Sequence, residues 1–567
     1  MRSRHPAIAA FVGLSAAMFV GTTLSSGGAV QAEVLDPTNT ANIQILSIND
    51  LHGNLEPPAG SSGRVGTVNA GGAEYLATHV RALKQTNKNT LIVSAGDLIG
   101  ASPLLSALFD DEPTIDVVSA MGMDMAGVGN HEFDRGAAEL KRIDKGGCKP
   151  NVRCQNEIWQ GSPFPYIAAN VIDQKTGQTI LPPWYYRDID GVRVGFIGLT
   201  LKDTPTIVTP SGVAGLQFKD EVETINANAA ILRQRGANAI IVVIHQGGRG
   251  AAGTPNDCKD FSGPIIDIVK KTSSIIDAYL TAHTHEGYNC IIDGKPVMQG
   301  ASFGRLVTKL DMVVQRGRDG RVVSSKATNV IVTRDVPKAA DITAIIEKYK
   351  RLSAPKANRV VGSIAATFDR KESVSGETPL GDLIADSQLA ATKDAALGGA
   401  QLALMNPGGI RTDLVYEQIS GGENAGQVTY AEAFAVQPFG NNLMTVTITG
   451  AQLKTVLEQQ FDNPTSNTQR ILQVSQGFSY SYSKAASVGS KVIASSMKLD
   501  GKTVDPAAKY RVTVNSFLAD GGDNFLELAK GTERLGGVID LDALESYLLK
   551  LGSPAKVTLL DRINLGG

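Results

Sequence analysis

Short apolar runs alternate with stretches of helical spacing from residue 43 to about residue 333. Several aliphatic runs end abruptly at a polar residue, which is typical of buried parallel strands. These runs are 43–48, 91–93, 240–244 and 275–280, and 192–199 and 307–314 are further strand candidates. Amphipathic helices are predicted at 73–83 and 222–235, and the glycine-rich stretch 57–72 predicts a surface loop. The alternation indicates a layered α/β domain.

A single helix with prolines on both sides follows this region. Its apolar positions fall on one helical face and are Ile342, Ile345, Ile346, Tyr349 and Leu352. Pro337 and Pro355 flank the helix, so we expect it to span 341–352 and to connect two domains. After residue 360 the pattern changes to mixed α+β, with a helix at 379–393, a strand at 401–405, and a strand and helix across 443–461.

Composition supports a globular chain of several domains. At 567 residues the chain is too long for one ordinary core and suggests two large domains or three small ones. With 42% hydrophobic and 19% charged residues, it fits a soluble globular protein. A formal net charge of −2 argues against a nucleic-acid polymer as a partner, because such surfaces are usually basic.

The N-terminus predicts export. Basic residues precede an apolar stretch at 7–24, and small residues before Glu33 provide a signal-peptidase site, so we expect a signal peptide over residues 1–32. No cysteine lies near this cut, which disfavours a lipoprotein, and residues 559–567 form no hydrophobic anchor. The predicted location is secreted, periplasmic or cell-wall associated, with no membrane span.

The four cysteines are an even number in a chain predicted to be exported, which favours disulfides. We prefer the pairs Cys148–Cys154 and Cys258–Cys290 because cysteines close in sequence pair readily, although three pairings are formally possible. A cysteine zinc site is the weaker interpretation, since no CxxC motif occurs.

Candidate metal ligands follow the predicted strands. The motifs are Asp50-Leu-His52, Gly96-Asp97, Gly129-Asn130-His131-Glu132, a lone His245, and His283-Thr-His285. In open α/β sheets the loops at the carboxyl ends of strands converge, so these five segments would meet at one place. Five of the seven histidines belong to them, while His5 lies in the predicted signal and His79 in a predicted helix. One such histidine would be interpreted as structural, but five at strand ends indicate a metal site.

In this order the motifs resemble those of the calcineurin-like metallophosphoesterases, and the rest of the chain is similar to the C-terminal domain of secreted 5'-nucleotidases. The resemblance implies a four-layer α/β sandwich joined by a linker helix to an α+β substrate-binding domain. The implied divisions are a signal peptide at 1–32, a metallophosphoesterase domain at 33–335, a linker helix at 336–358 and a 5'-nucleotidase C-terminal domain at 359–567.

The resemblance also implies the catalytic centre. Two divalent metal ions, zinc as first choice and manganese as second, would be held by Asp50, His52, Asp97, Asn130, His245, His283 and His285. Asp97 would bridge the two ions. Metal-bound hydroxide would attack the phosphorus, and His131, fixed by Asp134, would stabilise or protonate the departing oxygen.

Substrate contacts are implied in the loops of the second domain. They are Asn406, Arg411, Phe439, Asn441, Phe517 and Asp523. The two phenylalanines would sandwich the nucleobase, the aspartate would accept ribose hydroxyls, and the arginine would grip phosphate. One departure is that relatives carry further arginines where this chain has Val374-Ser-Gly376, so either Arg370 and Lys371 substitute for them or the grip on the phosphate is weaker.

The expected function is hydrolysis of nucleoside 5'-monophosphates by a 5'-nucleotidase-type phosphoric monoester hydrolase, a monomer or weak dimer. UDP-sugar and cyclic-nucleotide hydrolysis are alternatives within the same family. A non-catalytic surface binding protein is the rival from another class. That rival predicts damaged ligand positions, whereas all of them are intact in this chain.

Overall fold

The computed structural model describes residues 39–148, 158–208, 212–251, 253–464 and 466–566. Residues Thr40–Gly567 form one compact unit. The predicted signal peptide, residues 1–32, lies outside the described residues. Among the residues described, no helix is both long and apolar enough to cross a membrane.

Two six-stranded sheets form the first half of this unit. The first has the order β16 (Val322–Ile331), β15 (Leu306–Gln315), β1 (Thr40–Ile48), β4 (Thr90–Ser94), β5 (Met125–Gly127) and β6 (Tyr166–Ile167). The second has the order β13 (Gly287–Ile292), β14 (Lys295–Gly300), β12 (Ala278–Thr281), β11 (Ala239–His245), β9 (Val192–Thr200) and β8 (Trp184–Ile189). The central strands β1, β4 and β5 of the first sheet run parallel, as do β9, β11 and β12 of the second.

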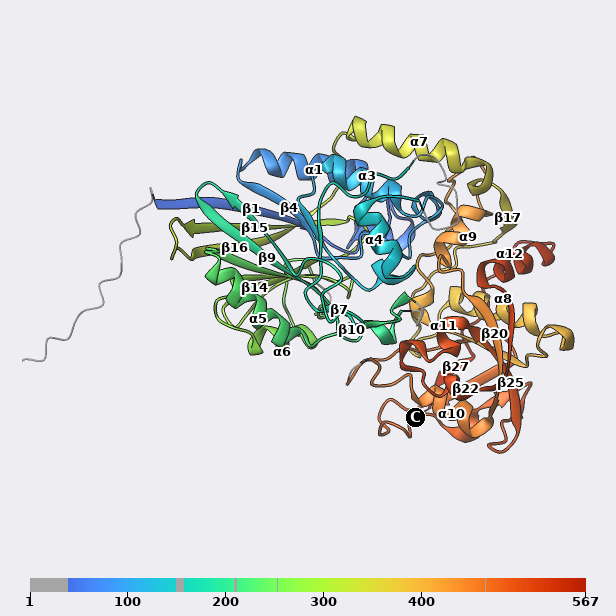
Figure 1. The fold of residues 1–567 in the computed structure, drawn as a ribbon. Helices are drawn as coiled ribbons and strands as arrows, with labels where there is room; N and C mark the ends of the chain where they lie inside the picture. The colour runs from blue at the N-terminus through green and yellow to red at the C-terminus, as the bar shows by residue number, and fades with distance from the viewer. Residues whose placement is uncertain (1–38, 149–157, 209–211, 252, 465, 567) are drawn as a thin grey trace, which may run out of the picture. The chain divides into compact units, whose positions relative to one another are not determined.

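Helices cover the outer faces of both sheets (Figure 1). Those on the first sheet are α1 (Ala73–Gln85), α3 (Glu112–Met121), α4 (Ala137–Lys145) and α7 (Ala340–Ala357); those on the second are α5 (Glu221–Gln234) and α6 (Pro264–Lys271). Between the sheets lies a separate core that joins residues of β1 and β4 to residues of β9, β11 and β12. The four-layer sandwich expected from the sequence is therefore confirmed.

Strand β11 shows why continuous apolar runs form the centre of this fold. Successive side chains of a strand point to opposite faces. Ile241 and Val243 enter the core between the sheets, whereas Ile240, Val242 and Ile244 pack beneath the outer helices. Both faces are covered, so every position must be apolar, and the run ends where β11 reaches the site at His245.

Helix α7 is longer than the sequence suggests. It spans Ala340–Ala357 and contains Pro355, which we expected to lie beyond its end. A proline in the last turn removes only one helical hydrogen bond, so the helix continues past it. On the predicted apolar face, Ile342, Ile346 and Tyr349 are buried, whereas Leu352 is 49% exposed.

The second half contains a five-stranded sheet of order β21 (Gln473–Val474), β18 (Leu402–Met405), β25 (Lys509–Asn515), β20 (Asn442–Thr449) and β26 (Thr532–Ile539). Its helices include α8 (Pro379–Thr392), α9 (Tyr430–Val436), α10 (Gly450–Glu458) and α12 (Asp540–Lys550). Capping boxes begin α9 at Thr429 and α10 at Thr449, each satisfying two backbone N–H groups. The elements predicted at 379–393, 401–405 and 443–461 are all present.

Two local predictions have different outcomes. The disulfide Cys258–Cys290 is present, and Cys148 is disulfide-bonded, while Cys154 of its expected pair lies outside the described residues. The stretch 57–72 is not a simple surface loop, because it contains a 3-10 turn (Gly60–Gly63) and a short hairpin of β2 (Arg64–Val65) and β3 (Val68–Asn69). Buried Ser62 shows that part of it packs inward.

Candidate metal centre and adjoining pockets

The carboxyl ends of β1, β4, β5, β11 and β12 bring the predicted metal ligands together. Five of these ligands have left-handed backbone conformations, with φ of 48° at Asp50, 47° at His52, 50° at Asp97, 77° at His283 and 59° at His285. Non-glycine residues adopt this region rarely, and such residues cluster at functional sites. The backbone itself therefore turns these side chains toward one point.

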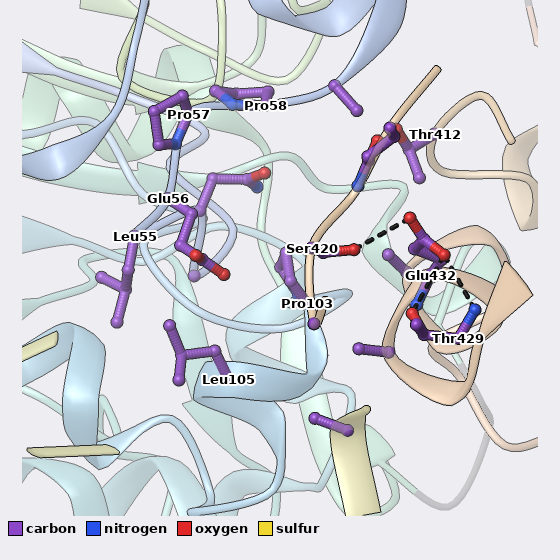
Figure 2. A pocket seen from close by; sticks show the side chains of 18 of the residues that line it. Leu55, Glu56, Pro57, Pro58, Pro103, Leu105, Thr412, Ser420, Thr429 and Glu432 are labelled. Carbon is purple, nitrogen blue, oxygen red and sulfur yellow. Dashed lines mark hydrogen bonds between the residues drawn. The ribbon is translucent and has the colours of Figure 1, made fainter. Parts of the chain in front are cut away.

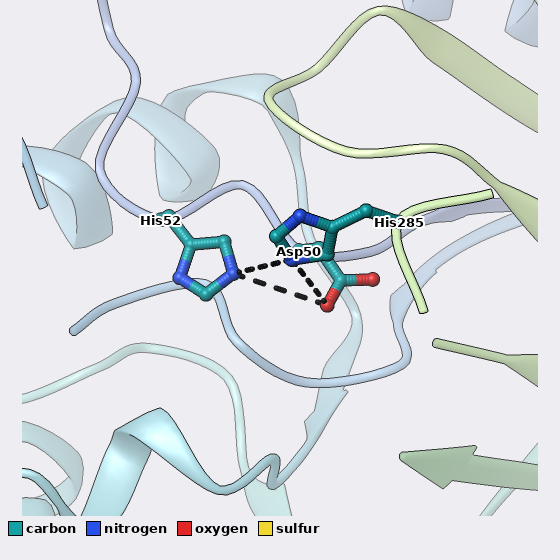
Figure 3. Close-up of side chains that lie close together, drawn as sticks. All are labelled: Asp50, His52 and His285. Atoms are coloured by element: carbon teal, nitrogen blue, oxygen red, sulfur yellow. Dashed lines mark hydrogen bonds and ion pairs between the residues drawn. The ribbon is translucent and has the colours of Figure 1, made fainter. Parts of the chain in front are cut away.

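Asp50, His52 and His285 form one group of potential ligands (Figure 3). The Nε2 atoms of the two histidines lie 3.1 Å apart, and Nε2 of His285 lies 3.5 Å from Oδ1 of Asp50. Three ligand atoms that converge this closely match the donor set of a divalent ion with nitrogen and oxygen ligands.

A second group lies beside the first. Nε2 of His245 is 2.9 Å from Oδ2 of Asp97, and that same oxygen is 3.6 Å from Nε2 of His52. Nδ1 of His283 lies 3.0 Å from Oδ1 of Asn130. The Asp97 carboxylate thus lies between the two groups, which is the position that a bridging ligand requires.

Hydrogen bonds to backbone carbonyls orient the imidazoles. Nδ1 of His52 lies 3.0 Å from the carbonyl oxygen of Gly100, and Nδ1 of His245 lies 2.9 Å from that of Ala95. Such bonds fix the tautomer that leaves Nε2 free to bind a metal. Nε2 of His245 is buried and faces Oδ2 of Asp97 at 2.9 Å, which places the two atoms to bind one ion. The residues present therefore fit a pair of divalent ions.

The charges of the cluster agree with this fit. Burial lowers the pKa of His52 and of His283, so both imidazoles are neutral, as metal ligation requires. Burial alone would lower the pKa of His245, but the charge and hydrogen bond of Asp97 together with the charge of Asp50 outweigh burial and raise the pKa to about 9. A proton balances the carboxylate there, and a bound cation would displace it.

His131 and Asp134 form the predicted pair next to this cluster. Nδ1 of His131 lies 2.9 Å from Oδ2 of Asp134, and the backbone N–H of His131 donates to Oδ1 of Asp97 at 2.9 Å. Burial lowers the pKa of His131, but Asp134 and Asp97 outweigh it, so the pKa is raised overall. The imidazole is held in one tautomer with its Nε2 atom available for a ligand.

Two residues that sequence reasoning did not single out support the cluster. Glu132 accepts backbone hydrogen bonds from Gly129, Asp97 and Leu98 at 2.6, 2.9 and 2.8 Å, which ties two ligand loops together. Asn49 donates to Oδ2 of Asp50 at 2.7 Å. The only sequence signal was their position beside predicted ligands, inside the Gly129–Glu132 motif and next to Asp50.

A cavity of about 350 Å³ opens onto this centre. All six predicted substrate contacts line it, namely Asn406, Arg411, Phe439, Asn441, Phe517 and Asp523, together with Asn130, His131, Asp134 and His283. The Phe439 ring stacks on the His131 ring, with centroids 5.7 Å apart and planes inclined by 23°. The predicted metal ligands, the His131 pair and the predicted base-stacking residues therefore meet in one place.

A basic pocket of about 230 Å³ adjoins His285. Arg305, Arg370 and Arg411 line it together with serines. Arg370 pairs with Asp413 at 3.1 Å, but among the described residues neither of the other two arginines pairs with a carboxylate, and Nη2 of Arg411 is buried without a hydrogen bond. Burial, together with the charge of Arg370, lowers the pKa of Arg305 to about 10. The pocket has an excess of positive charge that an anion would neutralise.

The segment Val374–Gly376, where relatives carry further arginines, does not line the basic pocket. The Val374 side chain is 78% exposed, and a Cβ at Gly376 would lie 2.6 Å from Cγ1 of Ile471. Of the two predicted substitutes, Arg370 lines the basic pocket, whereas Lys371 is exposed and does not. Arg305, which sequence reasoning missed, is the third guanidinium.

Another cavity, of about 430 Å³, lies between the β1–α1 connection, helix α7 and loops of the second half (Figure 2). The glutamates that line it already have hydrogen-bond or ion-pair partners. Glu432 accepts hydrogen bonds from Ser420 and Thr429, and Glu56 pairs with Lys350 at 2.7 Å. Apart from Arg411, none of the predicted site residues lines this cavity.

Comparison with known proteins identifies both halves of the chain. Residues 43–287 match the calcineurin-like phosphoesterase family, and residues 360–530 match the 5'-nucleotidase C-terminal domain. A cell wall protein of Listeria monocytogenes is 33% identical over 91% of this chain and 68% of its own length. An endonuclease of Bacillus subtilis is 32% identical over 93% of this chain, which spans 41% of that relative. A 5'-nucleotidase precursor from Thermus thermophilus shares the fold, with a TM-score of 0.76 at 23% identity over 93% of this chain and 99% of its own.

Proposed function

Because the chain belongs to the 5'-nucleotidase family of calcineurin-like phosphoesterases, we propose that it hydrolyses nucleoside 5'-monophosphates to nucleosides and phosphate. The observation that carries the proposal is the cavity beside the ligand cluster. It is lined by two loop phenylalanines, an arginine and the His131–Asp134 pair. A base, a ribose and a phosphate thus each have a chemically matched surface.

Two divalent ions would be held by the seven predicted ligands, with Asp97 as the bridge. When bound, they would supply Lewis acidity toward the phosphoryl oxygens and promote deprotonation of water. The mixed nitrogen and oxygen ligand set suits zinc, manganese, cobalt or iron, and we propose zinc as the first choice and manganese as the second.

His131 is proposed to protonate the departing O5' oxygen. Its Nδ1 atom is engaged by Asp134, which leaves Nε2 as the atom that can reach substrate. The raised pKa of His131 keeps more of the imidazole protonated near neutral pH, as a general acid requires.

Arg411 is proposed to grip the phosphate, since it lines both the nucleotide cavity and the basic pocket. Arg305 and Arg370 would assist from the basic pocket and take the place of the arginines missing near Val374. Phe439 and Phe517 would stack on the base. Asn441 is proposed to contact the base and Asp523 the ribose hydroxyls, while Asn406 would assist Arg411 at the phosphate and ribose.

The domain divisions at residues 32, 335 and 358 are part of the same proposal, as is an extracellular or cell-surface location, which the cell wall relative supports. Hydrolysis of UDP-sugars or of cyclic nucleotides is the alternative within this family. The endonuclease relative adds nucleic acid to the substrates to be tested.

The test is a substrate panel on purified protein. AMP, UDP-glucose, cyclic AMP, ATP and a single-stranded oligonucleotide would be assayed after chelation and after addition of Zn²⁺ or Mn²⁺. We expect AMP hydrolysis that chelation abolishes and metal restores. His245→Ala should abolish it, whereas His79→Ala, a matched control whose ring binds the carbonyl of Thr333 away from the cluster, should not. A metal-loaded protein that does not release phosphate from AMP would refute the proposal.

A further inference from the structure

Arg470 lies in the nucleotide cavity at the carboxylate expected to bind ribose. Its Nη1 atom donates to Oδ1 of Asp523, and the amide of Asn406 donates to the other oxygen, Oδ2, at 2.8 Å. Both oxygens of the carboxylate therefore already have partners. Arg470 was not among the residues predicted from the sequence.

The surrounding contacts fix this corner of the cavity. Asp523 has a left-handed φ of 55°, and Asn463 donates to its backbone carbonyl at 2.7 Å. Asn515 donates to Oδ1 of Asn406 at 2.9 Å, which orients the Asn406 amide toward the carboxylate. Arg470 therefore meets a rigid partner, and its side chain keeps 20% exposure toward the cavity.

The pairing changes the charge that a ribose would meet. An unpaired carboxylate suits ribose hydroxyls but repels any anion attached to the sugar. Here a guanidinium cancels that charge. Of the arginines in the described lining of the cavity, Arg249 pairs with Glu286 and Arg470 with Asp523, while Arg411 has no carboxylate partner among the described residues. The sugar end of this cavity therefore carries no excess negative charge.

We infer that this corner accepts a nucleotide with a second phosphate on the 2' or 3' oxygen of its ribose, bound by Arg470. The inference rests on the proposed function and defines a substrate class for the same site. A planar guanidinium offers paired N–H donors that match phosphate oxygens. Asp523 keeps the guanidinium in place while leaving other donors of its fork for the ligand.

The reaction on such a substrate concerns the 5'-phosphate alone. Water adds to the 5'-phosphorus, the bond from phosphorus to O5' breaks, and O5' takes a proton. The products are inorganic phosphate and a nucleoside that keeps its 2'- or 3'-phosphate. Arg470 acts as a specificity-determining residue and takes no part in bond breaking.

The experiment compares kcat/KM for adenosine 3',5'-bisphosphate, adenosine 2',5'-bisphosphate and AMP. Arg470→Gln should lower kcat/KM for at least one bisphosphate tenfold or more relative to AMP, because a charge-assisted hydrogen bond is lost. Arg470→Lys should recover part of the ratio. Arg249→Gln is the matched control, since Arg249 lines the same cavity but pairs with Glu286, and it should leave the ratio unchanged. The two bisphosphates distinguish the 2' from the 3' position.

An unchanged ratio in Arg470→Gln, with normal AMP hydrolysis, would overturn the inference and leave the proposed function intact. If wild-type protein does not hydrolyse AMP, the proposed function itself fails. The wild-type KM offers a check that needs no variant. It should be no higher for the better bisphosphate than for AMP, and a tenfold higher KM for both bisphosphates would overturn the inference.

Discussion

Substitution of Gly129 by alanine should disable the metal centre through one methyl group. A Cβ at this position would lie 2.1 Å from Oδ1 of Asp97 and 2.7 Å from Cε1 of His245. Ordinary contact begins at 3.4 Å, so the carboxylate would have to move by more than 1 Å. Both neighbours are buried, and Glu132 and backbone groups hold the loops around them.

The expected effect follows from that displacement. Overpacking a fixed site costs roughly 1–3 kcal/mol, and a misplacement of about 1 Å at a reacting centre can lower the rate by roughly 10²-fold. We expect kcat/KM for AMP to fall by at least that factor, because Asp97 is the proposed bridge between the ions. Metal affinity should fall with it.

The assay combines AMP hydrolysis with metal content after equilibrium dialysis and with thermal unfolding in the presence and absence of Zn²⁺. Gly536→Ala is the control, since a Cβ there would find only the sulfur of Met444, at 3.7 Å. If Gly129→Ala kept wild-type turnover and both ions, neither the tight geometry around Asp97 nor its bridging role could be upheld.

Four further variants test other parts of the structure. His131→Ala should lower kcat by roughly 10²-fold or more, and a near-normal rate would contradict its role as the acid. Asp134→Asn should shift the basic limb of the pH profile for kcat to lower pH, because the carboxylate raises the pKa of His131. An unmoved limb would contradict the role of Asp134. Burial raises the pKa of Asp540 from 3.8 to about 7, so its contribution to stability is present below about pH 4 and lost as the pH rises through 7. In denaturant titrations wild type should therefore lose up to about 4 kcal/mol relative to Asp540→Asn between pH 4 and 8, and parallel curves would show that Asp540 titrates normally. Cys258→Ser combined with Cys290→Ser should lower the free energy of unfolding by about 3–4 kcal/mol for a separation of 32 residues, and an unchanged unfolding midpoint would oppose this estimate.

Local patterns predicted the elements and the ligand cluster well. The continuous apolar run that forms β11 predicted a strand covered on both faces, and its end marked the place of His245. The chain has few histidines, and most of them follow such strands, so convergence at the sheet edge could be predicted from short segments.

The basic pocket could be predicted only in part, since Arg411 was predicted and Arg370 was offered as a substitute, whereas Arg305 was missed. Arg305 precedes α7 in the sequence and Arg370 follows it. They line the same pocket only because distant segments of the chain contact each other. The residues around a single arginine do not show whether its guanidinium is exposed to solvent or binds phosphate, so such a ligand cannot be recognised from the local sequence. For Leu352, helical spacing predicted the face of the helix on which it lies, but not whether another element covers that position.

The left-handed backbone at five of the predicted ligands has a consequence for metal exchange. Since hydrogen-bonded loops already hold Asp50, Asp97 and the histidines in place, an incoming ion does not have to order the chain. Removing the ions should then leave the fold and the pocket geometry nearly intact, so that one protein preparation can be reloaded with different cations. Differences in rate between such preparations would report the chemistry of each ion and not the folding state of the protein.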